Sequence, residues 1–184
     1  MNSFKTNDKG FTGLEAAIVL IAFVVVAAVF SYVVLGAGFF TTQKAQETVY
    51  KGVEQSTANI QMIGNVYGLS TDNVSITNVT FVIGLAPGAS AVDLTKMKIV
   101  FSTPTTAPII LTQATNSSAT EFSTMIGATA VTAMNPNDQV EIKFATAAVP
   151  ANTKMTIELR PSVGAALPFS KTAPATIANT NVLY

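Results

Sequence analysis

The chain has 184 residues, which is enough for one long helix and one modest domain. Lys plus Arg and Asp plus Glu both number 10, so the formal net charge is zero, which argues against nucleic acid as a partner because phosphates require a basic surface. Cys and His are both absent, which excludes a disulfide framework, removes the commonest general base and metal ligand, and favours a structural or binding role over an enzyme.

The first element is an apolar run that follows a short charged leader. No Lys or Arg occurs between Lys9 and Lys44, and nothing between Ala16 and Phe40 is charged. The run is longer than the roughly 20 apolar residues that span a bilayer. No small-residue cleavage site ends it, unlike an ordinary secretory signal. Lys9-Gly10-Phe11 precedes it instead. A cut after Gly10 would remove a leader of residues 1–10 and retain the apolar helix, which indicates assembly as well as export.

Glu15 lies near the start of this helix. A carboxylate at the middle of a membrane costs about 2.5–3.5 kcal/mol, and less near an end. The dipole at a helix N-terminus favours negative charge. If cleavage frees the amine of Phe11, this cation is a natural partner for Glu15, within one chain or between neighbours. We therefore expect Phe11 and Glu15 to act in assembly. The alternative is that Glu15 is an acid at the membrane–water interface of a simple membrane anchor.

We expect the helix to run from residue 11 to about 64, with a helical domain of residues 11–66, because all eight prolines fall at or after Pro87. Gly64 and Gly68 are the expected stop signals. The second part of the helix is amphipathic, with an apolar stripe that packs either on the protein's own domain or on neighbours. The stripe contains Ala45, Val49, Val53, Ile60 and Ile63, and the polar side contains Lys44, Glu47, Lys51 and Glu54.

Residues 67–184 are rich in Thr, Ser, Val and Ala and show the alternation of half-buried strands. Four alternating runs carry this signal: Val79, Phe81, Ile83; Met97, Ile99, Phe101; Val140, Ile142, Phe144; and Met155, Ile157, Leu159. Turn clusters separate them, for example Pro87-Gly88. The expected fold is therefore α+β, with a long hydrophobic N-terminal helix followed by an antiparallel β-sandwich or barrel-like outer domain.

Three sequons make Asn73, Asn78 and Asn116 candidates for N-glycosylation. Asn135, Asn137, Asp138 and Glu141 could supply oxygen ligands to a cation such as calcium, but Asn-Pro-Asn-Asp is an ordinary turn and we predict no metal site. Gly36-Ala37-Gly38 lacks the context of a phosphate loop and indicates either close helix packing or a locally weak point of the helix. We find no nucleophile–base pair, and we predict neither catalytic residues nor a cofactor.

The start of the chain resembles that of archaellins, the archaeal flagellins. The resemblance lies in Lys9-Gly10 and the block from Phe11-Thr12-Gly13-Leu14-Glu15 through Phe30. Further segments agree in order along the chain: Ala86-Pro87-Gly88 with Val92-Asp93-Leu94, then Ile157 to Ala165, Lys171-Thr172-Ala173-Pro174, and Asn181-Val182-Leu183-Tyr184.

The resemblance implies a maturation and assembly route. A membrane peptidase of the prepilin type would cut between Gly10 and Phe11. The precursor would wait in the cytoplasmic membrane until an ATP-driven platform loads it into an extracellular helical homopolymer. The N-terminal helices would form the filament core, and the β domains, often glycosylated in this family, would form its sheath. The filament would be rotated for swimming and could also adhere.

Three other functions share parts of this pattern. An adhesive type IV-like pilin has the same leader, the same acid and a similar helix bundle, although the C-terminal segments argue against it. A filament accessory or an anchored receptor has the same topology without a polymer. A membrane-anchored surface enzyme is disfavoured by the absence of His and Cys and of a recognisable site.

Overall fold

The computed structural model describes residues 8–184, and it describes side chains from residue 13 onward. The chain divides into two compact units, the helical part up to Tyr50 and the part from Lys51 to Tyr184.

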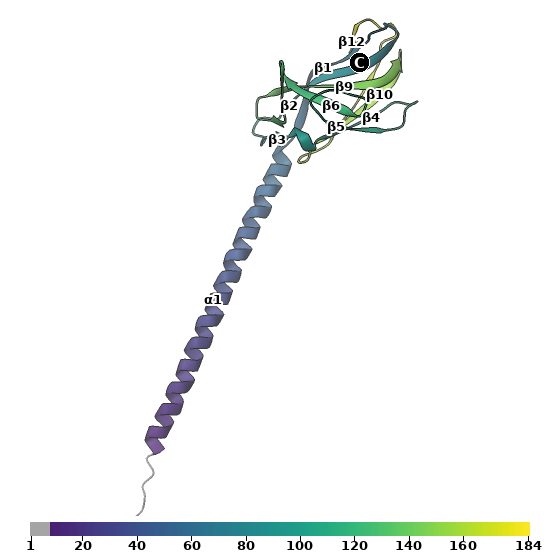
Figure 1. The fold of residues 1–184 in the computed structure, drawn as a ribbon. Helices are drawn as coiled ribbons and strands as arrows, with labels where there is room; N and C mark the ends of the chain where they lie inside the picture. The colour runs from purple at the N-terminus through teal and green to yellow at the C-terminus, as the bar shows by residue number, and fades with distance from the viewer. Residues whose placement is uncertain (1–7) are drawn as a thin grey trace, which may run out of the picture. The chain divides into compact units, whose positions relative to one another are not determined.

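Helix α1 runs without a break from Asp8 to Thr57 and has 50 residues, so it is roughly 75 Å long (Figure 1). The expected end of the helix at about residue 64 is wrong. The helix ends at Thr57, where the chain turns and Asn59 N–H donates to the carbonyl of Thr57. Ala58 and Ile60 are then buried in the β domain, so tertiary burial ends the helix before either glycine is reached.

The part of the chain after the helix is almost entirely β structure. Its strands are β1 (Ile60–Leu69), β2 (Ser75–Leu85), β3 (Val92–Asp93), β4 (Lys98–Ser102), β5 (Ile109–Gln113), β6 (Glu121–Ile126), β7 (Thr129–Ala130), β8 (Ala133–Met134), β9 (Gln139–Pro150), β10 (Lys154–Arg160), β11 (Leu167–Thr172) and β12 (Thr180–Leu183). A 3₁₀ turn, η1, covers Leu94–Lys96.

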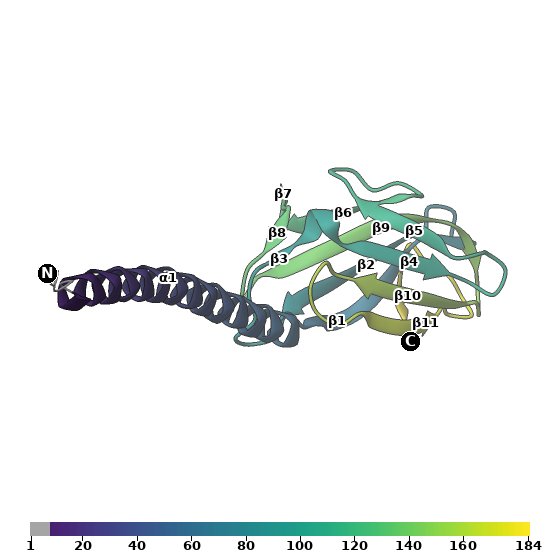
Figure 2. The ribbon, with the colours of Figure 1, turned by 90° about the horizontal axis from the view of Figure 1, so that it is seen from below.

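One large sheet follows the order β11-β10-β4-β5-β6-β9-β2-β1-β12, with β7 paired to β6, and β3 and β8 form a separate ribbon (Figure 2). The two ends of this sheet meet. Thr172 N–H donates to the carbonyl of Tyr184 at 2.6 Å, and Tyr184 N–H donates to the carbonyl of Thr172 at 3.3 Å. The sheet is thus a nearly closed barrel, which confirms the α+β expectation.

The four alternating runs of the sequence supply the barrel interior. Each of their twelve side chains is at most 3% exposed. Phe144 makes edge-on contacts with Phe81 and Phe101, at ring-centroid distances of 6.5 and 5.6 Å. Alternation at period two therefore identified the inward face of β2, β4, β9 and β10 correctly.

The pairing is antiparallel with one exception. β5 and β6 pair in parallel, through Thr112 with Glu121 and Gln113 with Phe122. The segment between them leads the chain back before β6 begins, and Thr112 N–H donates to the carbonyl of Thr120 there. The alternating pattern carries no information on strand direction, so this exception could not be read from it.

The two glycines expected to stop the helix lie inside β1. Gly64 has a φ of +75° and falls where the register of β1 against β2 shifts, between Ile63 and Tyr67. This positive φ is the conformation that a β-bulge assigns to glycine. Gly68 pairs with Val79 on one side and Asn181 on the other. Both residues therefore shape a strand and do not end a helix.

Candidate functional site

The apolar part of α1 is the largest exposed hydrophobic surface of the described chain. Every residue from Gly13 to Phe40 is exposed, and the large side chains of this stretch are exposed by between 52 and 80%. Apolar residues occupy all faces of the helix, which is typical of a helix surrounded by lipid or by similar helices. This stretch, residues 13–40, is called the apolar segment below.

Glu15 lies within the apolar segment, near the N-terminal end of α1, and its side chain is exposed. The backbone of Lys9, Gly10 and Phe11 belongs to the first turns of the helix, whose bounds begin at Asp8. The side chains of these three residues, and the leader before Asp8, lie outside the described part. The proposed partnership between Glu15 and the amine of Phe11 therefore stays a prediction.

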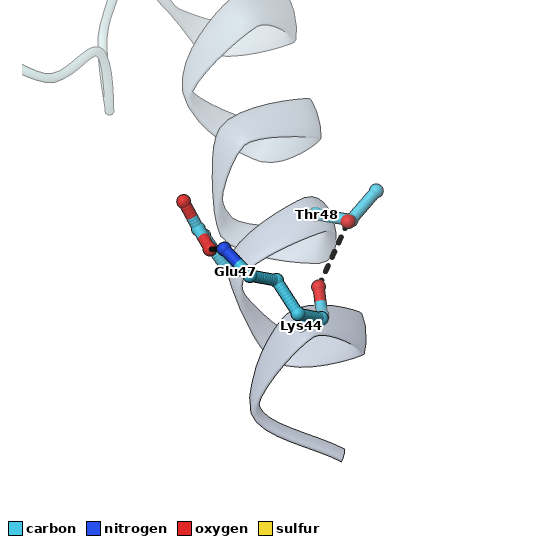
Figure 3. A network of polar contacts seen from close by, with 3 residues as sticks. All are labelled: Lys44, Glu47 and Thr48. Carbon is cyan, nitrogen blue, oxygen red and sulfur yellow. Dashed lines mark hydrogen bonds and ion pairs between the residues drawn. The ribbon is translucent and has the colours of Figure 1, made fainter. Parts of the chain in front are cut away.

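Beyond the apolar segment the helix satisfies its own polar groups. The hydroxyls of Thr41 and Thr42 donate to the carbonyls of Ala37 and Gly38, at 2.7 and 2.9 Å. One turn on, Thr48 donates to the carbonyl of Lys44 at 2.8 Å, and Lys44 Nζ lies 2.7 Å from Glu47 Oε2 (Figure 3). Hydroxyls bonded in this way can be covered by a neighbouring helix without losing a partner.

The end of α1 is held by a loop of the β domain. Gln55 Nε2 donates to the carbonyl of Gly164 at 3.3 Å, and Ala86 N–H donates to the carbonyl of Asn59 at 3.0 Å. Gly164 has a φ of +101°, and a Cβ at this position would lie 1.6 Å from the carbonyl oxygen of Ala58. Only glycine allows the loop between β10 and β11 to approach the junction of helix and strand this closely.

The sequon at Asn73 occupies the turn between β1 and β2. Asn73 is exposed with a φ of +57°. Asp72 organises the turn: its carboxylate accepts the backbone N–H groups of Val74 and Ser75, each at 3.0 Å, and the hydroxyls of Ser70 and Ser75. These hydrogen bonds, first those from the two backbone N–H groups, hold the pKa of Asp72 well below its usual range.

The other two sequons lie in different surroundings. Asn116 is exposed in the loop between β5 and β6. Asn78 lies within β2, half-buried, between Leu69 of β1 and Ala145 of β9. The hydroxyl of Thr80, the third residue of that sequon, donates to Glu141 Oε1 at 2.7 Å.

The group of oxygen-bearing residues near Asn135 forms a turn. Asp138 Oδ2 accepts the backbone N–H and the Nδ2 of Asn135, both at 3.0 Å. Glu141 lies on β9, where it accepts the hydroxyl of Thr80. Asp138 and Glu141 therefore accept hydrogen bonds from different protein groups. Asn135 and Asp138 form the ordinary turn that the sequence indicates.

Comparison with known proteins identifies the family. The chain matches the archaeal-type flagellin family over residues 10–171. It is 41% identical to "Probable flagellin 1" of Archaeoglobus fulgidus over 198 aligned positions, which cover 98% of this chain and 97% of that protein.

This chain is an archaeal-type flagellin.

Two solved structures are similar to this flagellin. The archaeal flagellum of Methanospirillum hungatei strain JF1 is 35% identical, with a TM-score of 0.76, and the match covers 94% of this chain and 99% of that one. The flagellin FlaB1 of Methanocaldococcus jannaschii is 14% identical, with a TM-score of 0.58 over 68% of this chain and 96% of that one, which shows a shared fold.

As a flagellin the protein is a structural, non-enzymatic subunit of the archaellum, the extracellular filament used for motility. The pilin, accessory-protein and surface-enzyme alternatives are therefore not supported. The apolar segment is the surface of this flagellin that is suited to filament contacts. The sequence interpretation missed the role of Gly164, although it lies in a segment that carries the family resemblance. A glycine after Pro161-Ser162-Val163 was the available signal.

Proposed function

We propose that this flagellin polymerises through the apolar segment of α1, which packs against the same segment of neighbouring copies. The observation that carries the proposal is the exposure of all residues of this segment, on every face of the helix. Helix contacts that repeat head to tail do not close on themselves, so they generate a filament.

The energies are sufficient for such a contact. Burying one Val, Leu, Ile or Phe side chain contributes about 1.5–3 kcal/mol, whereas association costs roughly 4–15 kcal/mol in lost freedom. The apolar segment contains more than a dozen such side chains, each at least half exposed. Gly36 and Gly38 have open space where a Cβ would lie, so a neighbouring helix can approach closely there.

Before assembly, we place the same helix in the cytoplasmic membrane. α1 is long and apolar enough to cross a membrane by length and composition. The charge-free stretch from Ala16 to Phe40 is roughly 37 Å long, compared with about 30 Å for the hydrocarbon core of a bilayer. An ATP-driven platform at the base of the filament would transfer the helix from lipid to the filament core.

Maturation by a prepilin-type peptidase, with cleavage between Gly10 and Phe11, belongs to the same proposal. It would leave a new amine on Phe11 near Glu15, at a helix end whose dipole favours the carboxylate. An ion pair between these groups, within one subunit or between two, would reduce the cost of the charge in an apolar core.

A pair of variants tests the role of Glu15. In cells whose only flagellin is the variant, E15Q is expected to be cleaved at Phe11 and to remain in the membrane, with few or no filaments. The matched control is E54Q, which removes an exposed acid of the same helix outside the apolar segment and should assemble normally. Normal amounts of filament from E15Q would contradict the proposed role of Glu15.

We further propose that the outer domain carries N-glycans, and that Asn73 and Asn116 are the better acceptors. Both are exposed in connections between strands, whereas Asn78 lies within a paired strand. Because the hydroxyl of Ser75 is hydrogen-bonded to Asp72 in the folded turn, we propose that the glycan is transferred to Asn73 before the domain folds.

Mass spectrometry of peptides from N73Q and N116Q filaments should show the loss of the extra mass at each site. Extra mass on Asn78 alone would contradict the proposed preference for Asn73 and Asn116.

A further inference from the structure

Residues 36–42 of α1 combine two features that weaken a helix. The first is a pair of glycines in the helix interior, Gly36 and Gly38, with nothing within 4 Å of a Cβ added at either position. Glycine is the least favourable helix residue after proline, because its backbone loses the most freedom on ordering. No proline lies in α1, since every proline of the chain falls at or after Pro87. Residues 36–42 are called the glycine–threonine segment below.

The second feature is a pair of threonines that bond the carbonyls at the centre of this segment. The hydroxyl of Thr41 donates to the carbonyl of Ala37 at 2.7 Å, and that of Thr42 to the carbonyl of Gly38 at 2.9 Å. In an α-helix the same two carbonyls accept the backbone N–H groups of Thr41 and Thr42. Each carbonyl therefore has two donors and keeps a partner when its backbone bond lengthens. Threonine hydroxyls bonded in this way often bend helices.

The glycine–threonine segment lies where the helix would leave the hydrocarbon core of a membrane. With Glu15 at the cytoplasmic interface, the roughly 20 residues that cross about 30 Å of hydrocarbon extend from Ala16 to Leu35. Residues 36–42 then lie at the opposite membrane–water interface. Water at this interface can bond a carbonyl that bending exposes, whereas hydrocarbon cannot.

Gly52, in the same helix, lacks this combination. It also has nothing within 4 Å of an added Cβ, so it is equally open to substitution. The hydroxyl bonds described near it run from Thr48 to the carbonyl of Lys44 and from Thr57 to the carbonyl of Val53. Gly52 is therefore a matched control for the two glycines of the segment.

The helix has to serve two environments that set its direction differently. In a bilayer, interfacial anchors and hydrophobic length influence the tilt of a helix, whereas in a filament its packing against neighbouring helices sets the crossing angle. A rigid helix of 50 residues would have to change direction as a whole. A bend at residues 36–42 lets the helix beyond Thr42 change direction while the part in lipid stays in place.

We propose that the glycine–threonine segment is a hinge, which bends while the precursor is held in the membrane and straightens as the subunit enters the filament. The inference rests on the proposed membrane stage and polymerisation, and it adds a conformational step between them.

Distances between two spin labels measure such a bend directly, because the chain contains no Cys to interfere. The pair V29C/Y50C lies on either side of the hinge. The control pair L14C/L35C is separated by the same number of residues and lies within the apolar segment. All four native side chains are more than half exposed. Each uncleaved full chain is reconstituted in lipid vesicles, and the distribution of label–label distances is measured by pulsed electron paramagnetic resonance.

We expect the distances in V29C/Y50C to be spread at least about twofold more widely than those in L14C/L35C, and G36A/G38A to narrow them to the control width, because alanine favours a straight helix. In cells whose only flagellin is the variant, G36A/G38A should reduce the number of filaments at least about tenfold, since the hinge can no longer bend. G52A should assemble normally. Alanine has the highest helix propensity, so these variants retain the helix.

The outcomes separate the hinge from other roles of the glycines. Equal widths for the two label pairs, or a width that G36A/G38A does not change, would overturn the inference. Loss of filaments without a change in width would assign Gly36 and Gly38 to close helix packing alone. A narrowed distribution with normal filament numbers would show that assembly does not need the hinge and would also overturn the inference. Filaments that lack this chain altogether would refute the proposed function itself.

Discussion

Gly164→Ala tests whether the loop between β10 and β11 holds the end of α1. The structure places the added Cβ 1.6 Å from the carbonyl oxygen of Ala58, whereas ordinary contact begins at 3.4 Å. The loop or the junction must therefore move until this distance has more than doubled. Such a movement also separates Gln55 from the carbonyl of Gly164.

The expected cost has two parts. The φ of +101° at Gly164 is strained for alanine, which costs about 1–2 kcal/mol. Displacing the backbone around Ala58, whose side chain is 1% exposed, adds about 2 kcal/mol. Gly88→Ala isolates the first part, because Gly88 has a φ of +82° and nothing within 4 Å of an added Cβ.

The assay is urea denaturation of the detergent-solubilised full chain, with the β-sheet signal followed by circular dichroism. We expect the free energy of unfolding to fall by about 1 kcal/mol in G88A and by about 3 kcal/mol in G164A. If G164A costs no more stability than G88A, the close approach at Ala58 does not contribute to the stability of the junction.

Three further predictions concern the β domain. F144A, which removes a fully buried ring packed edge-on against two others, should lower the free energy of unfolding by about 3–5 kcal/mol in the same assay. N181A should cost about 1–3 kcal/mol, because the buried amide bonds both the carbonyl and the N–H of Ala178 and the carbonyl of Gly68; a neutral effect would contradict this role. For Asp72, hydrogen bonds hold the folded pKa below the unfolded value of about 3.9, so its carboxylate stabilises the fold at neutral pH and this contribution declines as the pH falls below about 4. The stability difference between wild type and D72N should therefore be present at pH 7 and shrink in acid; a constant difference would show that the charge is not responsible.

The strands with strict alternation could be predicted from sequence, and those without it could not. β2, β4, β9 and β10 each place one residue in two into the core, so Phe81, Ile99, Phe144 and Ile157 marked them in advance. β1 gives no such signal, because large hydrophobic residues lie on both of its sides: Ile60 and Val66 are buried, whereas Ile63 and Tyr67 are exposed. Its aliphatic residues therefore fitted a continued helix as well as a strand, and only pairing with β2 and β12 decides between the two.

The apolar segment was predictable because its signal is local. Twenty-five consecutive residues without charge, from Ala16 to Phe40, need no tertiary information to be recognised. The outer face of the β domain depends on tertiary structure. Tyr67 and Val182 are far apart in the chain and become neighbours through the register of two strands, so no window of sequence contains this surface. The role of Gly164 was hidden for the same reason, since its neighbour Ala58 lies on another element.

The proposed filament subunit is a cleaved chain that retains its apolar helix. Intact and peptide mass spectrometry of filaments sheared from native cells decides whether this chain is present. We expect an abundant mature chain that begins at Phe11, with extra mass on the peptides that contain Asn73 or Asn116. A chain that still begins at Met1, remains in the membrane fraction and is absent from filaments would contradict it.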